Sequence, residues 1–182
     1  MHALKCSALA LLGLTVMVMS PLVKGNAQSV NASTQACLPT ATLEQFPAAF
    51  DAAISGPGNK DRTCLRQLLM PDARIVLTVR VAEGVLAPHS IGVEDWITAV
   101  SKRGADSLFE REVKVSSDTF DRIAHLWCTY ELRGTPDGKA TSRGLVSIEV
   151  VFDAQTKSWK IAEVSWQPER PDGQKIPAKY LP

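Results

Sequence analysis

Two titratable side chains in the second half of the chain, His125 and Glu131, have the chemistry that acid–base catalysis needs. Burial in an apolar pocket would move the pKa of each side chain toward neutral pH. They are six positions apart on one predicted strand, or about 20 Å at ~3.3 Å per residue, so the two groups cannot touch. A joint mechanism therefore needs a ligand between them or a different partner. The alternative is structural, because a histidine in mid-strand is more often held by its own hydrogen bonds.

Three antiparallel strands must position these side chains, and the rest of the chain is organised around them. Runs rich in β-branched and aromatic residues predict strands over 122–132, 142–152 and 159–166, with tight turns at 135–138 and 153–157. Side chains alternate between the two faces of a strand. One face of the first strand carries His125, Trp127, Thr129 and Glu131. The other face carries Ala124, Leu126, Cys128 and Tyr130, of which Tyr130 is a further candidate for chemistry but more often a packing residue.

The register of the first two strands decides which face lines a pocket. A two- or four-residue loop centred on the Asp-Gly pair of the turn sets Trp127 opposite Ile148 and His125 opposite Val150. A three- or five-residue loop instead sets His125 opposite Glu149. The Asp-Gly pair favours the first register. It predicts an apolar pocket wall into which one imidazole and one carboxylate are set.

Helical segments are predicted to close this pocket. Thr42 and Gln45 have capping-box spacing and begin a helix whose buried stripe includes Phe50. A second helix is predicted over 61–69, and a third begins near Glu94 and turns Trp96 inward. Shorter strands are predicted over 74–81 and 109–116, and residues 84–89 are read as a loop.

The predicted pocket has apolar walls with few polar groups, which suits a small apolar molecule. Its predicted ligand contacts come from the first two strands and from the helices: Trp127, Thr129, Phe50, Trp96 and Ile148.

The order helix, helix, short strand, helix and long antiparallel meander resembles one superfamily of folds. Two local features carry the same resemblance: the segment Leu-Leu-Met-Pro-Asp-Ala at 68–73 and a last strand built on Trp-Lys-Ile at 159–161. Over residues 43–166 the chain resembles nuclear transport factor 2-like (NTF2-like) proteins, which include ketosteroid isomerase-like and SnoaL-like members. The resemblance implies an α+β fold, a cone-shaped curved antiparallel sheet closed by three N-terminal helices, and a homodimer. Relatives use the pocket for isomerisation, dehydration, hydrolysis or binding alone, so fold does not settle function.

The enzymatic relatives differ from this chain in their chemical groups. Ketosteroid isomerases bring an acidic base and a tyrosine–acid pair into the pocket, and the sequence does not identify all three. Dehydratase-like relatives pair histidines with an aspartate, whereas only His89 and His125 remain after the N-terminal segment. We therefore predict an exported small-molecule-binding domain, with an enzyme of the ketosteroid isomerase or dehydratase type as the alternative.

The N-terminus has the order of a secretory signal peptide. Lys5 precedes an apolar run over 7–19, Pro21 ends it, and small residues follow at 25–27. We predict a signal peptide over 1–27, a flexible lead-in over 28–40, the NTF2-like domain over 41–168 and an extended Pro-rich tail over 169–182. Export implies an oxidising compartment, so the mature protein is expected to be periplasmic or secreted.

The cysteine count and the net charge limit the cofactors and partners that the sequence predicts. Cys37, Cys64 and Cys128 remain after cleavage; Cys37 and Cys64 either form a disulfide or stay reduced, and Cys128 is predicted to be a buried thiol. The cysteine and histidine spacings predict no metal site, and no phosphate loop or other cofactor motif is present. The 20 Lys and Arg residues nearly balance the 19 Asp and Glu residues, which predicts no nucleic-acid partner and no membrane partner after cleavage.

Overall fold

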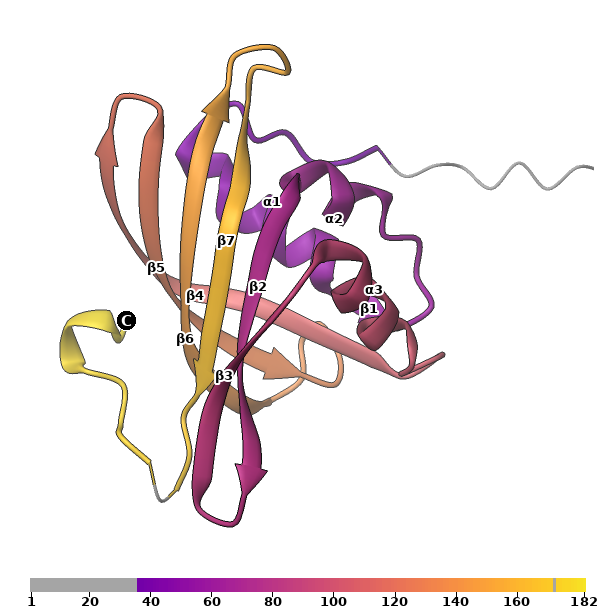
Figure 1. Ribbon diagram of the computed structural model, residues 1–182, viewed down its shortest axis with the longest axis vertical. Helices are drawn as coiled ribbons and strands as arrows, with labels where there is room; N and C mark the ends of the chain where they lie inside the picture. The colour runs from indigo at the N-terminus through magenta and orange to yellow at the C-terminus, as the bar shows by residue number, and fades with distance from the viewer. Residues whose placement is uncertain (1–35, 172) are drawn as a thin grey trace, which may run out of the picture. The chain divides into compact units, whose positions relative to one another are not determined.

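The computed structural model describes residues 36–171 and 173–182. The predicted signal peptide and the first part of the lead-in lie outside these residues. Figure 1 shows the elements in chain order. They are η1 (Leu43–Gln45), α1 (Phe46–Ile54), β1 (Gly56–Pro57), α2 (Thr63–Leu68), β2 (Leu69–Ala82), β3 (Val85–Ile91), α3 (Val93–Ser101), β4 (Ser107–Phe120), β5 (Ile123–Arg133), β6 (Ala140–Asp153), β7 (Ser158–Pro168) and η2 (Ala178–Tyr180).

The strands form one seven-stranded sheet in the order β1-β4-β5-β6-β7-β2-β3. All neighbouring strands are antiparallel except β2 and β7, which are parallel. Irregularities in the pairing at Glu112/Lys114 and Glu149/Val150 are places where an extra residue bends a strand. The result is a curved sheet that does not close on itself, since β1 and β3 remain at its edges.

The helices start where the sequence chemistry favours them. Thr42 and Gln45 form the predicted capping box, and a proline in the first turn of α1 needs no hydrogen-bond donor. Arg62 binds the far end of α1 by donating to the carbonyl oxygens of Ala53 and Ile54 at 2.9 and 2.8 Å. Glu94 lies in the first turn of α3, where the helix dipole favours a carboxylate.

The three helices cover one face of the sheet, which we call the concave face, and the C-terminal segment lies on the other side (Figure 1). The structure is thus a mixed α+β fold with a curved sheet and few helices. It does not confirm three N-terminal helices, because α3 follows the β2–β3 hairpin. In addition, β3 occupies most of the segment 84–89 for which the sequence predicts a loop. The hairpin forms because residues 75–82 of β2 pair with residues 85–91 across a two-residue turn at Glu83 and Gly84.

The core lies between the helices and the concave face. Its enclosed side chains come from α1, α2 and the central strands: Phe46, Leu65, Ile75, Leu126, Ile148, Ile161 and Val164. Burial of such side chains is the main favourable term in folding. The core therefore identifies the inner face of β5 as the one that carries Leu126.

The predicted register of β5 and β6 was wrong, and the alternative is observed. His125 lies opposite Glu149 and Trp127 opposite Ser147, while Leu126 pairs with Ile148. The connecting loop occupies residues 134–139, and an irregularity at Leu132/Arg133 shifts the pairing by one residue. A shift of one residue moves every side chain to the opposite face. The convex face, opposite the helices, therefore carries His125, Trp127, Thr129 and Glu131.

A disulfide joins Cys37 to Cys64, which ties the segment before η1 to α2. Cys128 is the free cysteine of the described residues and is buried, as predicted. In the C-terminal segment, Tyr180 of η2 packs on Trp127 with ring centroids 5.5 Å apart. Across the described ranges, no helix combines the length and apolar character needed to cross a membrane.

Candidate functional site

A cavity of about 210 Å³ lies on the concave face, between α3 and the strands β4, β5 and β7. Its apolar wall is formed by Ile54, Trp96, Val100, Leu108, Leu132 and Trp166. Three polar side chains complete the lining: Arg103, Glu110 and Tyr130. A smaller cavity of about 40 Å³ shares Ile54, Trp96, Glu110 and Trp166 with it and adds Phe50 and Val146. Glu110 thus lies where the two cavities meet.

Three carboxyl groups from α1 and β4 gather at this end of the concave face. Glu110 and Glu112 point to the same side of β4, because residues two apart on a strand share a face. Asp51 of α1 accepts a hydrogen bond from the backbone N–H of Glu112 at 3.0 Å. One turn further on, the hydroxyl of Ser55 accepts from the backbone N–H of Glu110 at 2.9 Å. These two contacts fix α1 against β4 and bring the three acids together.

The three carboxyl groups differ from ordinary acids in their proton affinity. Burial raises the pKa of Asp51 to about 6, against the lowering effect of its hydrogen bond from Glu112. Burial and the charge of Asp51 raise the pKa of Glu110 to about 8. Burial and the charges of Glu110 and Asp51 raise the pKa of Glu112 to about 9. At pH 7, Asp51 is therefore mainly ionised, whereas Glu110 and Glu112 mainly keep their protons.

Tyr130 enters the cavity wall because its neighbour on β6 has no side chain. A Cβ atom on Gly144 would lie 2.3 Å from the Tyr130 hydroxyl oxygen, so only glycine leaves room for the ring. Burial, with the charges of Glu110 and Glu112, raises the pKa of Tyr130. The phenol therefore stays protonated and can donate a hydrogen bond into the cavity.

Arg103 is the cationic side chain of the cavity wall. Its Nε and Nη2 atoms are enclosed by protein and have no hydrogen-bond partner. Within the described part of the chain, no ion pair joins Arg103 to Glu110 or to any other carboxylate. The cavity therefore has a guanidinium and a carboxyl group on its wall that do not neutralise each other.

The predicted catalytic residues lie on the convex face, away from this cavity. His125 Nε2 is 2.9 Å from Ser147 Oγ and 4.0 Å from a carboxylate oxygen of Glu149. Glu131 is paired with Arg133 of the same strand. The catalytic prediction for His125 and Glu131 is therefore corrected, because the observed register turns both side chains away from the pocket.

The predicted ligand contacts divide between the two faces. Trp127 packs on Tyr180, and the buried hydroxyl of Thr129 donates to the carbonyl oxygen of Tyr180, so both are covered by the C-terminal segment. Phe50 lines the smaller cavity and Trp96 lines both. Ile148 lies on the concave face but is enclosed in the core rather than in either cavity wall. Phe50 and Trp96 thus line the concave cavity, whereas Trp127 lines a separate hollow of about 340 Å³ together with Ser147 and Gln167.

Sequence reasoning missed Asp51, Arg103, Glu110 and Glu112. The alternation of Glu110 and Glu112 within a predicted strand was a usable signal, because it places two acids on one face. Asp51 lies beside Phe50 on α1, and nothing in its own segment shows that the helix turns it toward β4. Only the packing of α1 on β4 brings it there.

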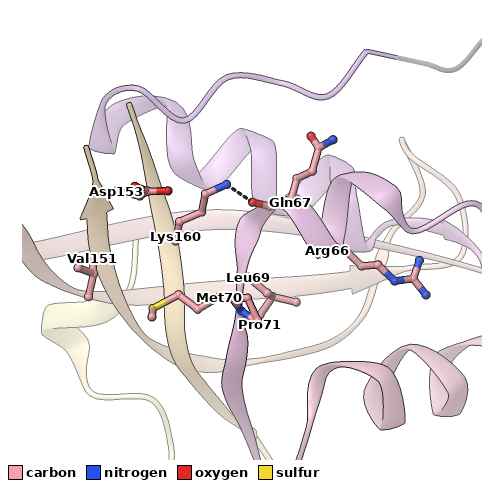
Figure 2. A pocket seen from close by; sticks show the side chains of 8 residues that line it. All are labelled: Arg66, Gln67, Leu69, Met70, Pro71, Val151, Asp153 and Lys160. Atoms are coloured by element: carbon pink, nitrogen blue, oxygen red, sulfur yellow. Dashed lines mark hydrogen bonds between the residues drawn. The ribbon is translucent and has the colours of Figure 1, made fainter. Parts of the chain in front are cut away.

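A second hollow, of about 460 Å³, lies where α2 leads into β2, beside β6 and β7. Figure 2 shows its lining, in which Lys160 donates to the backbone carbonyl of Gln67. The other charged side chains there also have partners: Arg66 binds Glu94 at 2.7 Å, and Asp153 accepts from the Thr156 hydroxyl at 2.7 Å. Because its charged groups are already satisfied, this groove is a weaker candidate site than the concave cavity.

Comparison with known proteins supports the fold and no particular activity. The sequence matches no protein-family model and no curated protein. A protein of unknown function from Mycobacterium tuberculosis is similar in structure, with 12% identity, a TM-score of 0.51, and coverage of 69% of this chain and 68% of that chain. A protein of unknown function with a cystatin-like fold from Nostoc punctiforme has 11% identity and a TM-score of 0.51. The match covers 69% of this chain and 86% of that chain. An NTF-2 like protein of unknown function from Silicibacter pomeroyi has 20% identity and a TM-score of 0.45. The match covers 66% of this chain and 87% of that chain.

The mixed α+β fold with a curved sheet agrees with the resemblance to nuclear transport factor 2-like proteins, although β1 and β3 are added to the element order that the resemblance implies. Within the described residues, no group of three His, Cys, Asp or Glu side chains could hold a metal ion.

Proposed function

We propose that the protein is a binding domain for a small molecule with an apolar body, held in the concave cavity. One observation carries this proposal: aromatic and aliphatic walls surround a few polar groups in a cavity of about 210 Å³. Such walls with few convergent polar groups are typical of small-ligand sites. The volume lies below the range of about 300–1,000 Å³ that is usual for drug-sized ligands, which favours a small ligand.

Filling the cavity tests this proposal. Ile54 lines both cavities, so Ile54→Phe should occupy the space that a ligand needs. We expect wild-type protein to bind small bicyclic molecules such as 1-indanone, with a change in fluorescence because Trp96 and Trp166 line the cavity. Ile54→Phe should weaken this binding at least tenfold, and His125→Ala on the convex face should leave it unchanged. Equal binding by wild type and a folded Ile54→Phe variant would place the ligand elsewhere.

The proposal includes export and a homodimer, as the sequence predicts. The signal-peptide pattern over 1–27 supports export, and cell fractionation with N-terminal sequencing of the mature chain tests it. Full-length protein recovered from the cytoplasm would reject export. Light scattering at micromolar concentration tests the homodimer, and a mass of one chain would reject it.

A second candidate function is proton-transfer catalysis on a small ketone or alcohol. The observation that favours it is the neighbouring pair Asp51 and Glu110, whose pKa values of about 6 and 8 bracket neutral pH. Glu110 reaches the cavity and would take the substrate proton, while Tyr130 would donate to the substrate oxygen. Exchange of the α-hydrogens of 1-indanone for deuterium, followed by NMR, should rise as Glu110 loses its proton near pH 8. An exchange rate no higher than that of buffer, or the same rate in Glu110→Gln, would reject this candidate.

A further inference from the structure

The concave cavity has two unlike polar ends. Glu110 lies at the junction of the two cavities, and Arg103 lies at the C-terminal end of α3. Both line the larger cavity, yet no ion pair joins them within the described residues. A ligand whose two charged groups lie between these side chains can therefore meet a carboxyl group and a guanidinium at once.

The Arg103 end favours an anion. Arg62 is buried beside it with its guanidinium bound only to carbonyl oxygens, including Pro57 at 2.7 Å. Burial, and then the charge of Arg103, lowers the pKa of Arg62, so two like charges face each other there. Nε and Nη2 of Arg103 are enclosed by protein and out of a ligand's reach, which leaves Nη1 as the guanidinium nitrogen able to meet an anion. Both enclosed nitrogens lack an acceptor in the protein.

Close packing holds Arg103 in place. A Cβ atom on Gly58 would lie 2.7 Å from the Cβ of Arg103, so the glycine lets the loop after β1 approach the arginine. The backbone N–H of Gly58 also donates to the carbonyl oxygen of Asp106 at 3.1 Å, which ties this loop to the chain after α3. These contacts fix the backbone from which the Arg103 side chain extends toward the cavity.

The Glu110 end favours a cation. The aromatic side chains Phe50, Trp96, Tyr130 and Trp166 line the two cavities that meet at Glu110. The face of an aromatic ring attracts a cation electrostatically. The carboxylate of Asp51 adds a negative charge near Glu110 at neutral pH. The charge of Arg111 acts on Asp51, but no ion pair joins Asp51 to a cation in the described part of the chain.

We propose that the cavity binds a small zwitterion with an apolar body, such as an aromatic amino acid. Its ammonium group would lie at Glu110 among the aromatic rings, its carboxylate at Arg103, and its apolar part against Trp96 and Leu108. This inference rests on the proposed function and narrows its ligand to one chemical class. Binding of the ammonium group should also release the proton that Glu110 carries at pH 7, because a neighbouring cation favours the carboxylate.

A matched set of four probes tests the charge requirement by calorimetry at pH 7. Phenylalanine carries both charges, 2-phenylethylamine only the ammonium, 3-phenylpropionate only the carboxylate, and 3-phenylpropan-1-ol neither. We expect phenylalanine to bind at least tenfold more tightly than any of the other three. Titrations in phosphate and in Tris should differ in heat by an amount that corresponds to most of one proton released per phenylalanine.

Two variants that remove a charge test which side chain binds which charged group of the ligand. The Arg103→Gln variant should bind phenylalanine only as tightly as wild type binds 2-phenylethylamine. The Glu110→Gln variant should bind phenylalanine only as tightly as wild type binds 3-phenylpropionate, and it should release no proton on binding. Arg122→Gln and Glu83→Gln, which are exposed in hairpin turns, serve as matched controls and should change neither affinity. If Arg103→Gln fails to fold, Arg103→Met keeps a long side chain without the charge, and it should likewise bind phenylalanine only as tightly as 2-phenylethylamine.

The outcomes separate this inference from the proposed function. Binding of 3-phenylpropan-1-ol or 1-indanone as tight as that of phenylalanine would overturn the zwitterion while leaving a binding cavity. Phenylalanine binding that is unchanged in folded Arg103→Gln and Glu110→Gln would also overturn it. Failure of every probe, including 1-indanone, would reject both.

Discussion

The backbone N–H of Glu112 in β4 donates a hydrogen bond to the Asp51 carboxylate of α1 at 3.0 Å. This contact links the first helix to the sheet and, at the same time, adds a negative charge beside two buried glutamates. Glu112 itself has no hydrogen-bond partner for either carboxyl oxygen. An isolated buried charge is expensive, so Glu112 avoids it by keeping its proton.

The first prediction is that stability falls as the pH rises. The pKa of Glu112 is raised from 4.5 to about 9 and that of Glu110 from 4.5 to about 8. Between these values the unfolded chain has released protons that the folded chain keeps. The free energy of unfolding should therefore be highest near pH 4.5 and decrease as the pH rises, levelling off above about pH 9, where both groups have ionised in the folded chain as well. Urea unfolding between pH 5 and 9 measures this slope.

Amide substitution identifies the group responsible. Glu112→Gln cannot ionise at this position, so it should reduce the slope to the part that Glu110 contributes. Glu83→Gln, in the exposed β2–β3 turn, should keep the wild-type slope. A wild-type stability that is flat or increases from pH 5 to pH 9 would contradict the assignment of raised pKa values.

The second prediction concerns the close approach of Tyr130 to Gly144. A methyl group at position 144 would lie 2.3 Å from the tyrosine oxygen and 2.6 Å from the carbonyl oxygen of Gln167. Gly144→Ala should therefore destabilise the protein by about 1–3 kcal/mol, as overpacking of a core usually does. Gly134→Ala is the control, because nothing lies within 4 Å of its added Cβ. Chemical unfolding measures both, and the cost at 144 should shrink in a Tyr130→Leu background.

The third prediction concerns the disulfide. The Cys37–Cys64 bond closes a 27-residue separation in the chain, and constraining the unfolded state over such a loop is worth about 3.5 kcal/mol. Reduction with dithiothreitol should lower the melting temperature of wild type. The double variant Cys37→Ser, Cys64→Ser should melt at the temperature of the reduced protein and not respond to the reagent. A wild type that melts at the same temperature with and without reductant would show that the bond does not form.

The fourth prediction concerns the C-terminal segment, which lies on the convex face. The buried hydroxyl of Thr129 donates to the carbonyl oxygen of Tyr180, so Thr129→Val should cost about 1 kcal/mol. Thr141→Val, which removes an exposed hydroxyl bond to Leu132, should cost less. Removal of residues 176–182 should expose Trp127 and shift its fluorescence to longer wavelength. An emission maximum that does not change on truncation would mean that the segment leaves Trp127 uncovered in solution.

Local patterns in the sequence determined much of the fold. The capping pair Thr42 and Gln45, the strand alternation around Leu126, and the 68–73 segment each depend on neighbouring residues. Chemistry of this kind can be read without knowing the tertiary structure. The same patterns predicted an NTF2-like fold and placed Phe50 and Trp96 on the side that faces the cavity.

The tertiary structure alone decided which face of β5 lines the cavity and which acids reach it. The face depends on a one-residue irregularity near Leu132, which the residue types of the turn do not reveal. Because of this irregularity, His125 and Trp127 point away from the cavity. Asp51 and Glu112 are 61 positions apart, and they meet only because α1 packs across β4. Contacts between distant segments follow from how whole elements pack against one another, and no local sequence pattern encodes that packing.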